Sequence, residues 1–369
     1  MKNIVVFSDG TGQDGGTENN TNVYKLFNII LDRSDKQISF YDPGVGTGFK
    51  KFSGNVGGRG LGENVRECYR FIVQEYKHGD KLFLFGFSRG AATVRSLAGF
   101  IHFFGILPRS RVELIDRAWE KYKIRNHNKR KNEINEFKEF NHSMRAEIQF
   151  LGVWDTVTAL GVPNTFLDKG LDRIIPHDFH DLKLSDIILN AYHALSIDDP
   201  RRTFHPSLFD TPKNAGHNNP KQNRKQVWFA GVHTDVGGGY KDKGLSDITL
   251  EWMVQNAVEH GLLLYIDPKE PFKRKCDPNI DGKIHNPVDN FWKRLIFKKK
   301  ERKWESTTEK PIIHQSVLDR MISAESKGYD PWIAKLNHDI EPMVSSKDVI
   351  TQPAFKILDP VTLSVLKNW

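Results

Sequence analysis

The sequence predicts an α/β fold in which helices cover both faces of a mostly parallel sheet. Short apolar runs alternate along the chain with segments whose apolar residues recur at helical spacing. Polar residues and glycines directly follow several of these runs, as they do where parallel strands end in loops. The 369 residues, of which 38% are hydrophobic, suffice for one large domain with a sizeable core. The alternation of strands and helices predicts parallel pairing with right-handed crossovers.

The alternation is clearest in the first hundred residues. Asn20 or Thr21 can cap the first helix, whose apolar residues then repeat with the helical period. We expect strands at residues 3–10, 38–46 and 81–87, and helices at 21–32, 62–76 and 91–100.

The second part of the chain starts with an interruption of this order. Residues 105–145 are helical in pattern and highly charged, and we expect them to form an inserted cap over the sheet. We then expect strands at 146–157 and 225–240, the latter ending in a glycine-rich loop, and helices at 184–199, 246–261 and 314–324. Residues 1–262 are therefore interpreted as one sheet-based unit. Residues 263–369 are interpreted as a basic, helical extension that packs on this unit or extends it.

The chain is basic, with a formal net charge of +8, and much of the excess lies in two segments, residues 123–140 and 291–304. The second segment mixes aromatic and basic residues on what we expect to be a short helix, as interfacial membrane segments do. A solvated charged helix with its apolar face docked on its own protein has the same pattern, so both interpretations stay open. The charge suits an anionic partner, such as an anionic membrane surface.

Several protein classes are excluded by what the sequence lacks. No apolar run approaches the roughly 20 residues that a membrane-spanning helix needs, and no apolar signal segment precedes the first strand. We therefore expect the chain to be cytoplasmic as synthesised, and any export to use a secretion system that reads no cleavable N-terminal signal. The two cysteines, Cys68 and Cys276, fall on a helix face and in a basic loop, so we expect neither a disulfide framework nor a zinc site.

The segment KLFLFGFSRGAAT, residues 81–93, has the pattern of a nucleophile elbow. A short apolar strand leads into Gly-Phe-Ser-Arg-Gly, and a helix follows. So sharp a turn holds Ser88 in strained backbone angles, and the flanking glycines let strand and helix approach without Cβ clashes. The helix N-terminus supplies N–H groups and a positive dipole suited to an oxyanion. The pattern favours Ser88 as a nucleophile over an ordinary strand–turn–helix.

A nucleophilic serine needs a base and a carboxylate that orients it, and on this kind of sheet the acid precedes the histidine along the chain. Asp155 ends the next expected strand after Ser88, and His233 follows a later strand in FAGVHTDVGGGY. We predict Asp155 as the acid and His233 as the base. His314 is the second choice, and His193 is a poorer candidate because it falls within an expected helix.

The loop after the first strand, SDGTG, is the expected second half of an oxyanion hole. The donors would be the backbone N–H of Arg89, next to the serine, and that of Gly10 or Thr11. Asp9 and Asp235 are possible supporting residues of the same site.

Two alternative functions stay open on the residues alone. Asp9, Asp235 and His233 could form the metal site of a metal-dependent phosphoesterase, although no third strong ligand spacing supports it. The glycine loops could instead hold a phosphate or nucleotide in a non-catalytic module, although no Walker lysine follows the glycines.

Five blocks occur in a fixed order along the chain: DGTG, GFSRGA, GVWDTV, HALSIDD followed by RR, and VWFAGVHTDVGGGY. On these blocks the sequence resembles, over residues 4–252, the DUF2235 family of α/β-hydrolases, which includes the Tle1 phospholipase effectors of type VI secretion. The resemblance implies an α/β-hydrolase fold and a catalytic triad at Ser88, Asp155 and His233.

The resemblance also implies the activity and its setting. We expect a serine esterase or lipase of the phospholipase A1 or A2 type that acts on membrane phospholipids and needs no cofactor or metal. As an antibacterial effector it would have a secretion-system or immunity partner. We expect no nucleic-acid partner.

Overall fold

The computed structural model describes residues 1–10, 16, 19–32, 34–44, 56–124, 126–157, 182, 184–209, 221–265, 276–289, 299–304, 306 and 309–343. Within these residues an eight-stranded sheet has the order β2-β1-β3-β4-β5-β6-β7-β8, and all its neighbouring strands are parallel. The strands are β1 (Asn3–Ser8), β2 (Gln37–Asp42), β3 (Lys81–Phe87), β4 (Ile148–Trp154), β5 (Asn190–Ser196), β6 (Asn223–Phe229), β7 (Ile312–His314) and β8 (Asp339–Glu341). The predicted α/β fold with a mostly parallel sheet is confirmed.

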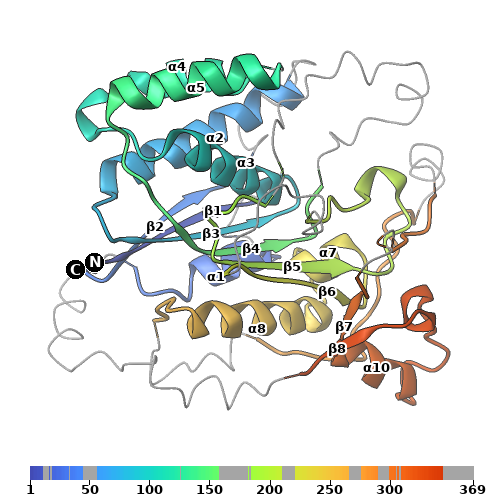
Figure 1. Ribbon diagram of the computed structural model, residues 1–369. Helices are drawn as coiled ribbons and strands as arrows, with labels where there is room; N and C mark the ends of the chain where they lie inside the picture. The colour runs from blue at the N-terminus through green and yellow to red at the C-terminus, as the bar shows by residue number, and fades with distance from the viewer. Residues whose placement is uncertain are drawn as a thin grey trace, which may run out of the picture.

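Helices cover both faces of the sheet (Figure 1). The α-helices are α1 (Asn22–Phe27), α2 (Val56–Glu75), α3 (Arg89–Phe104), α4 (Leu114–Tyr122), α5 (His127–Asn141), α7 (His233–Gly237), α8 (Gly244–Glu259) and α10 (Gln315–Ile322). Short 3₁₀ turns lie at η1 (Arg109–Arg111), η3 (Arg202–Phe204) and η5 (Trp332–Lys335). Helices α2 and α3 pack on one face, and α1 and α8 pack on the other.

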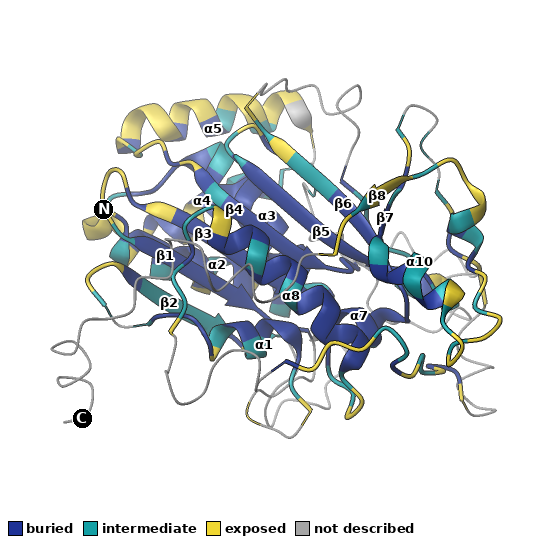
Figure 2. Ribbon diagram, turned by 90° about the horizontal axis from the view of Figure 1, so that it is seen from below, coloured by how far each residue is buried: buried dark blue, intermediate teal, exposed yellow. Residues whose placement is uncertain are grey.

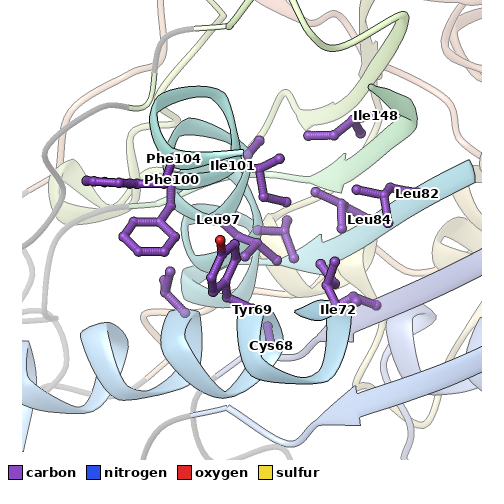
Figure 3. Close-up of a cluster of buried hydrophobic side chains, with 14 of the residues drawn as sticks. Cys68, Tyr69, Ile72, Leu82, Leu84, Leu97, Phe100, Ile101, Phe104 and Ile148 are labelled. Atoms are coloured by element: carbon purple, nitrogen blue, oxygen red, sulfur yellow. The ribbon is translucent and has the colours of Figure 1, made fainter. Parts of the chain in front are cut away.

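Strand β3 shows how the sequence builds these two layers. Leu82 and Leu84 pack into the cluster under α2 and α3, whereas Phe83 and Phe85 pack into the cluster under α1 and α8. Figure 3 shows part of the first cluster, in which side chains of α2 and α3 meet Leu82 and Leu84. A strand buried on both faces appears in the sequence as a continuous apolar run.

The insertion predicted at residues 105–145 is helical. Helices α4 and α5 pack outside α2 and α3, on the same face of the sheet (Figure 1). Helix α5 carries most of the first basic segment, and most of its surface is exposed (Figure 2). Ile134 and Phe137 are its buried contacts to the core.

The helix predicted at residues 184–199 is wrong. Residues 190–196 instead form β5, which pairs with β4 and β6 inside the sheet. All residues of β5 are buried, so no polar alternation marks it as a strand. The apolar residues Tyr192 and Leu195 also fit a helical stripe, which is why the pattern was ambiguous. His193 therefore lies on a strand.

The C-terminal extension is built into the same sheet. Strands β7 and β8 continue the sheet beyond β6, and α10 follows β7 directly. Residues 290–298 lie outside the described residues, and residues 299–304 are not helical, so a helix is wrong for this part of the second basic segment. Cys68 and Cys276 are free and buried. Within the described chain, no helix is both long and apolar enough to cross a membrane.

Candidate active site

Ser88 lies at the sharp turn between β3 and α3. Its backbone angles are φ 59° and ψ −120°, outside the regions that residues other than glycine usually adopt. A Cβ on Gly86 would lie 2.5 Å from the Gly90 carbonyl oxygen, and a Cβ on Gly90 would lie 2.0 Å from the Ser8 carbonyl oxygen. Glycine is therefore required on both sides of the serine, as the elbow pattern predicts.

Backbone strain is concentrated at this place. In the described chain, the non-glycine residues with positive φ are Ser88, Asp155 and His142, and the first two are predicted site residues. The Ser88 N–H donates to the Trp154 carbonyl, and the Val157 N–H donates to the Ser88 carbonyl, at 3.1 and 3.3 Å. The ends of β3 and β4 are thus tied together around Asp155. Strain of this kind typically persists at functional sites.

The Asp155 carboxylate and the His233 imidazole form a short, buried contact. The His233 Nδ1 lies 2.6 Å from Asp155 Oδ2, although the residues are 78 positions apart in the chain. Both side chains are almost fully buried. An imidazole held through Nδ1 by a carboxylate leaves Nε2 available as a base.

Aromatic rings and a second carboxylate hold His233 in place. His233 is the first residue of the short helix α7, and its backbone N–H donates to Asp199 Oδ2 at 3.1 Å. The rings of Phe87 and Phe204 lie against the imidazole, with centroids 4.6 and 5.0 Å away. Phe87 directly precedes Ser88, so this contact brings the histidine to the elbow. Within the described chain, no hydrogen bond joins Ser88 Oγ to His233.

Arg302 also belongs to the candidate site, although no sequence pattern pointed to this residue. Its guanidinium donates to Asp155 Oδ1 at 2.6 Å and to Oδ2 at 2.9 Å, and the side chain is 1% exposed. Burial alone would raise the pKa of Asp155, but the charge and hydrogen bonds of Arg302, with those of His233, hold it well below its usual value. Asp155 is therefore ionised over the whole physiological range. Arg302 lies in the basic segment 291–304, and nothing in the pattern of that segment distinguishes it from the exposed lysines around it.

Asp199 and Arg201 form a second missed pair. Arg201 donates to Asp199 from its backbone N–H, from Nε and from Nη2, at 3.0, 3.0 and 2.6 Å. Burial would raise the pKa of Asp199, but the Arg201 contacts outweigh this and lower it. Both residues belong to the block HALSIDD followed by RR, which is one of the blocks that carry the family resemblance. The sequence patterns assigned neither residue a role.

The expected oxyanion donors have different environments. The Gly10 N–H donates to Asp9 Oδ1 at 2.7 Å, so it is occupied in this structure. Thr11 lies outside the described residues. Arg89 is in the first turn of α3, where backbone N–H groups have no partner within the helix. Burial lowers the pKa of the Arg89 side chain to about 10, and that side chain makes no ion pair within the described chain.

Asp9 and Asp235 are each held by several hydrogen-bond partners. Asp9 accepts hydrogen bonds from Thr21 Oγ1 at 2.5 Å and Tyr41 OH at 2.8 Å as well as from Gly10, and burial raises its pKa to about 6. Asp235 accepts from the Val232 N–H at the start of α7 and pairs with His285 Nδ1 at 2.6 Å.

The structure does not bring Asp9, Asp235 and His233 together as a metal site. His233 pairs with Asp155, while each of the two carboxylates is held by other partners. No group of three or more His, Cys, Asp or Glu side chains in the described part of the chain could hold a metal ion.

The two rival histidines are placed elsewhere. His314 ends β7 and caps α10, with Nδ1 2.8 Å from Ser316 Oγ, and burial lowers its pKa to about 3. His193 Nε2 accepts from the Thr156 N–H at 3.1 Å, and burial also lowers its pKa to about 3. Neither ring is hydrogen-bonded to a carboxylate in the described chain.

Comparison with known proteins identifies related chains. Residues 2–256 match the family model described as type VI secretion system (T6SS) phospholipase effector Tle1-like, catalytic domain. The uncharacterized protein YEL023C of Saccharomyces cerevisiae is 29% identical in an alignment of 228 residues that covers 55% of this chain and 32% of the yeast protein. The chain thus spans about a third of the length of this relative.

Comparison with solved structures finds matches that share little sequence with the chain. An uncharacterized protein from Pseudomonas aeruginosa has a TM-score of 0.49 and 18% identity, over 76% of this chain and 49% of its own. The Tle1 effector bound to the VgrG spike of the type 6 secretion system has a TM-score of 0.38 and 18% identity, over 64% and 51%. The butyrate-bound esterase Est2 of Thermogutta terrifontis has a TM-score of 0.38 and 14% identity, over 71% and 84%.

Proposed function

Because the chain belongs to the family of Tle1-like phospholipase effectors of type VI secretion systems, we propose that it is a serine hydrolase that cleaves carboxylic esters of membrane phospholipids. The observation that carries the proposal is the buried pair of His233 and Asp155 beside the strained elbow of Ser88. The family supports the phospholipase class, and the geometry supports a serine mechanism.

In the proposed mechanism, Ser88 Oγ attacks the ester carbonyl carbon while His233 Nε2 takes the hydroxyl proton. Asp155 holds the imidazole by Nδ1 and stabilises its charged form. The tetrahedral intermediate collapses, the carbon–oxygen bond to the leaving alcohol breaks, and His233 gives its proton to that alcohol. Water then repeats the sequence on the acyl-serine, releasing the fatty acid and restoring Ser88.

The developing oxyanion needs donors close to Ser88. We assign this role to the Arg89 N–H at the start of α3, together with the Thr11 N–H or a Gly10 N–H released from Asp9. Cleavage at the sn-1 or sn-2 ester corresponds to a phospholipase A1 or A2.

We also propose a biological setting, and this part of the proposal rests only on the family to which the chain belongs. The protein would be delivered by a type VI secretion system as an antibacterial effector, with a secretion-system component as one partner and an immunity protein as another. Its surface of action would be an anionic membrane.

Kinetics of triad variants test the mechanism. Ser88→Ala, His233→Ala and Asp155→Asn should each lower turnover of a soluble short-chain ester and of phospholipid vesicles by roughly three orders of magnitude or more. The fold should be retained in the first two, whereas Asp155→Asn should also lose stability, because it leaves the buried charge of Arg302 without a counter-ion. A fluorophosphonate probe should label the wild type at Ser88 and leave Ser88→Ala unlabelled.

The matched control is His314→Ala, which changes another buried histidine. It should lose stability through the α10 cap and keep its catalytic rate once folded. Near-wild-type turnover of His233→Ala, combined with loss in His314→Ala, would show that the base is wrongly assigned.

A further inference from the structure

Arg302 is the one guanidinium that binds the carboxylate of the proposed triad within the described chain. We infer that Arg302 is a positioning residue, which fixes the orientation of the Asp155 carboxylate and, through it, that of the His233 imidazole. The inference rests on the proposed function, because it assigns Arg302 a role in that same triad. Arg302 lies outside residues 2–256, which match the family model.

The contacts of Arg302 define the plane of the Asp155 carboxylate. Nη1 and Nη2 each bind one carboxylate oxygen, and each also donates to a backbone carbonyl, that of Ser196 and that of Phe204, both at 2.7 Å. The Ser196 N–H donates to the same Asp155 Oδ1 at 3.0 Å. Fork-shaped bonds of this kind give geometric specificity that a lysine cannot supply.

The segment that carries Arg302 is held firmly in place. Lys299 forms an antiparallel bridge with Arg201, and the Lys300 N–H donates to the Pro200 carbonyl at 2.8 Å. His205 Nε2 lies 3.1 Å from the Lys300 carbonyl oxygen. Arg302 is thus anchored to the strand-end loop that also provides Asp199 and Phe204 to His233.

The alignment of Asp155 reaches His233 through a shared oxygen. Arg302 Nη2 lies 2.9 Å and His233 Nδ1 lies 2.6 Å from Asp155 Oδ2. Because both groups bind the same oxygen, a rotation of the carboxylate would also change the direction of its bond to the imidazole.

The other charged groups near the pair do not replace Arg302. Asp199 faces the His233 backbone, and Arg201 neutralises it. His193, on β5, is neutral at physiological pH because burial lowers its pKa to about 3. Burial raises the pKa of Asp198, near Arg302, to about 6, and its contacts are with Gly231 and Tyr329.

Two variants test the geometry of Arg302. Arg302→Lys keeps the charge but cannot bind both carboxylate oxygens as a fork, so kcat on a soluble short-chain ester should fall about 10-fold or more through lost alignment, while KM stays near that of the wild type. Arg302→Gln also lacks the fork and should lower kcat at least as much.

Arg320→Gln is the matched control, because Arg320 is also buried and also holds backbone carbonyls, those of Ile280 and Gly282, away from the triad. It should lower stability and leave kcat unchanged. A wild-type kcat for Arg302→Lys would overturn the inference, and so would an equal loss of kcat in Arg320→Gln. If Arg302→Lys did not fold, a wild-type kcat for Arg302→Gln would overturn it.

The NMR signal of the His233 Nδ1 proton distinguishes this inference from the proposed function. If the wild type hydrolysed no ester and its Ser88 reacted with no fluorophosphonate, the proposed function would fail. The inference would still stand if this signal were lost or moved in Arg302→Lys, because the bond from Nδ1 to Asp155 depends on the orientation of the carboxylate. Ester hydrolysis with the same signal in the wild type and Arg302→Lys would instead leave the function intact and refute the role of Arg302.

Discussion

One added methyl group at Gly237 should displace the proposed base. A Cβ at this position would lie 2.0 Å from Cε2 of the Phe87 ring and 2.3 Å from two other ring atoms. Ordinary contact starts near 3.4 Å, so the ring or helix α7 must move by about 1.4 Å. Because the Phe87 ring lies against the imidazole of His233, either movement changes the position of His233 relative to Ser88.

The expected magnitudes are different for stability and for activity. Overpacking of this kind costs roughly 1–3 kcal/mol, less than the roughly 5–15 kcal/mol by which domains are usually stable, so Gly237→Ala should still fold. A displacement of about 1 Å in a catalytic group costs roughly 100-fold in rate. We expect Gly237→Ala to lower kcat/KM on a soluble short-chain ester by about that factor and to lower Tm by a few degrees.

The assay is a double-mutant cycle with Phe87→Leu, which removes the ring that the new methyl group meets. Gly237→Ala should cost much less activity in the Phe87→Leu background than in the wild type. Gly328→Ala is the control for backbone strain, since Gly328 has φ +87° and no atom within 4 Å of an added Cβ, and it should lose stability only. Wild-type kcat/KM for Gly237→Ala, or an equal loss in both backgrounds, would refute the reasoning.

Two further predictions concern Asp9 and the exposed lysines. Burial raises the pKa of Asp9 to about 6 from 3.8, so the folded protein holds a proton that the unfolded chain releases. Its contribution to the free energy of unfolding should therefore fall as the pH rises from about 4 to 6, by up to roughly 3 kcal/mol, and urea unfolding of Asp9→Asn should lack this decline. An equal decline in both proteins would contradict the assignment. Charge reversal at Lys299 and Lys300 should weaken co-sedimentation with anionic vesicles and make it less salt-dependent, with short-ester hydrolysis unchanged. Equal binding at low salt would end the proposal of an anionic membrane surface there.

Local patterns were sufficient to predict most of the sheet. Strands β1, β3 and β4 each coincide with an apolar run that ends in a turn, β2 and β6 overlap the strands expected at 38–46 and 225–240, and the glycines around Ser88 predicted its strained angles. β5 was misread because a strand buried on both faces shows neither of the two periodicities clearly. The short strands β7 and β8 belong to the sheet through their pairing partners, which no local pattern indicates.

The candidate site was predicted in part. The chain order of Ser88, Asp155 and His233 followed from strand-end positions, and the structure pairs the last two at 2.6 Å. His233 was expected in a loop, whereas it begins the short helix α7. The role of Arg302 depends on a contact with Asp155 across 147 positions of the chain.

What the sequence by itself determined is therefore the set of features that neighbouring residues impose on the backbone: the order of strands and helices, and the strained turn at Ser88. Only the tertiary structure decided which charged groups are buried away from water and which protein groups pair with them there. The same arginine is a solvated cation on a surface and a fixed counter-ion in the interior, because burial makes an unpaired charge costly and a paired one specific. Arg302 and Lys300 lie two positions apart in one basic segment, and packing buried the first against Asp155 while leaving the second exposed.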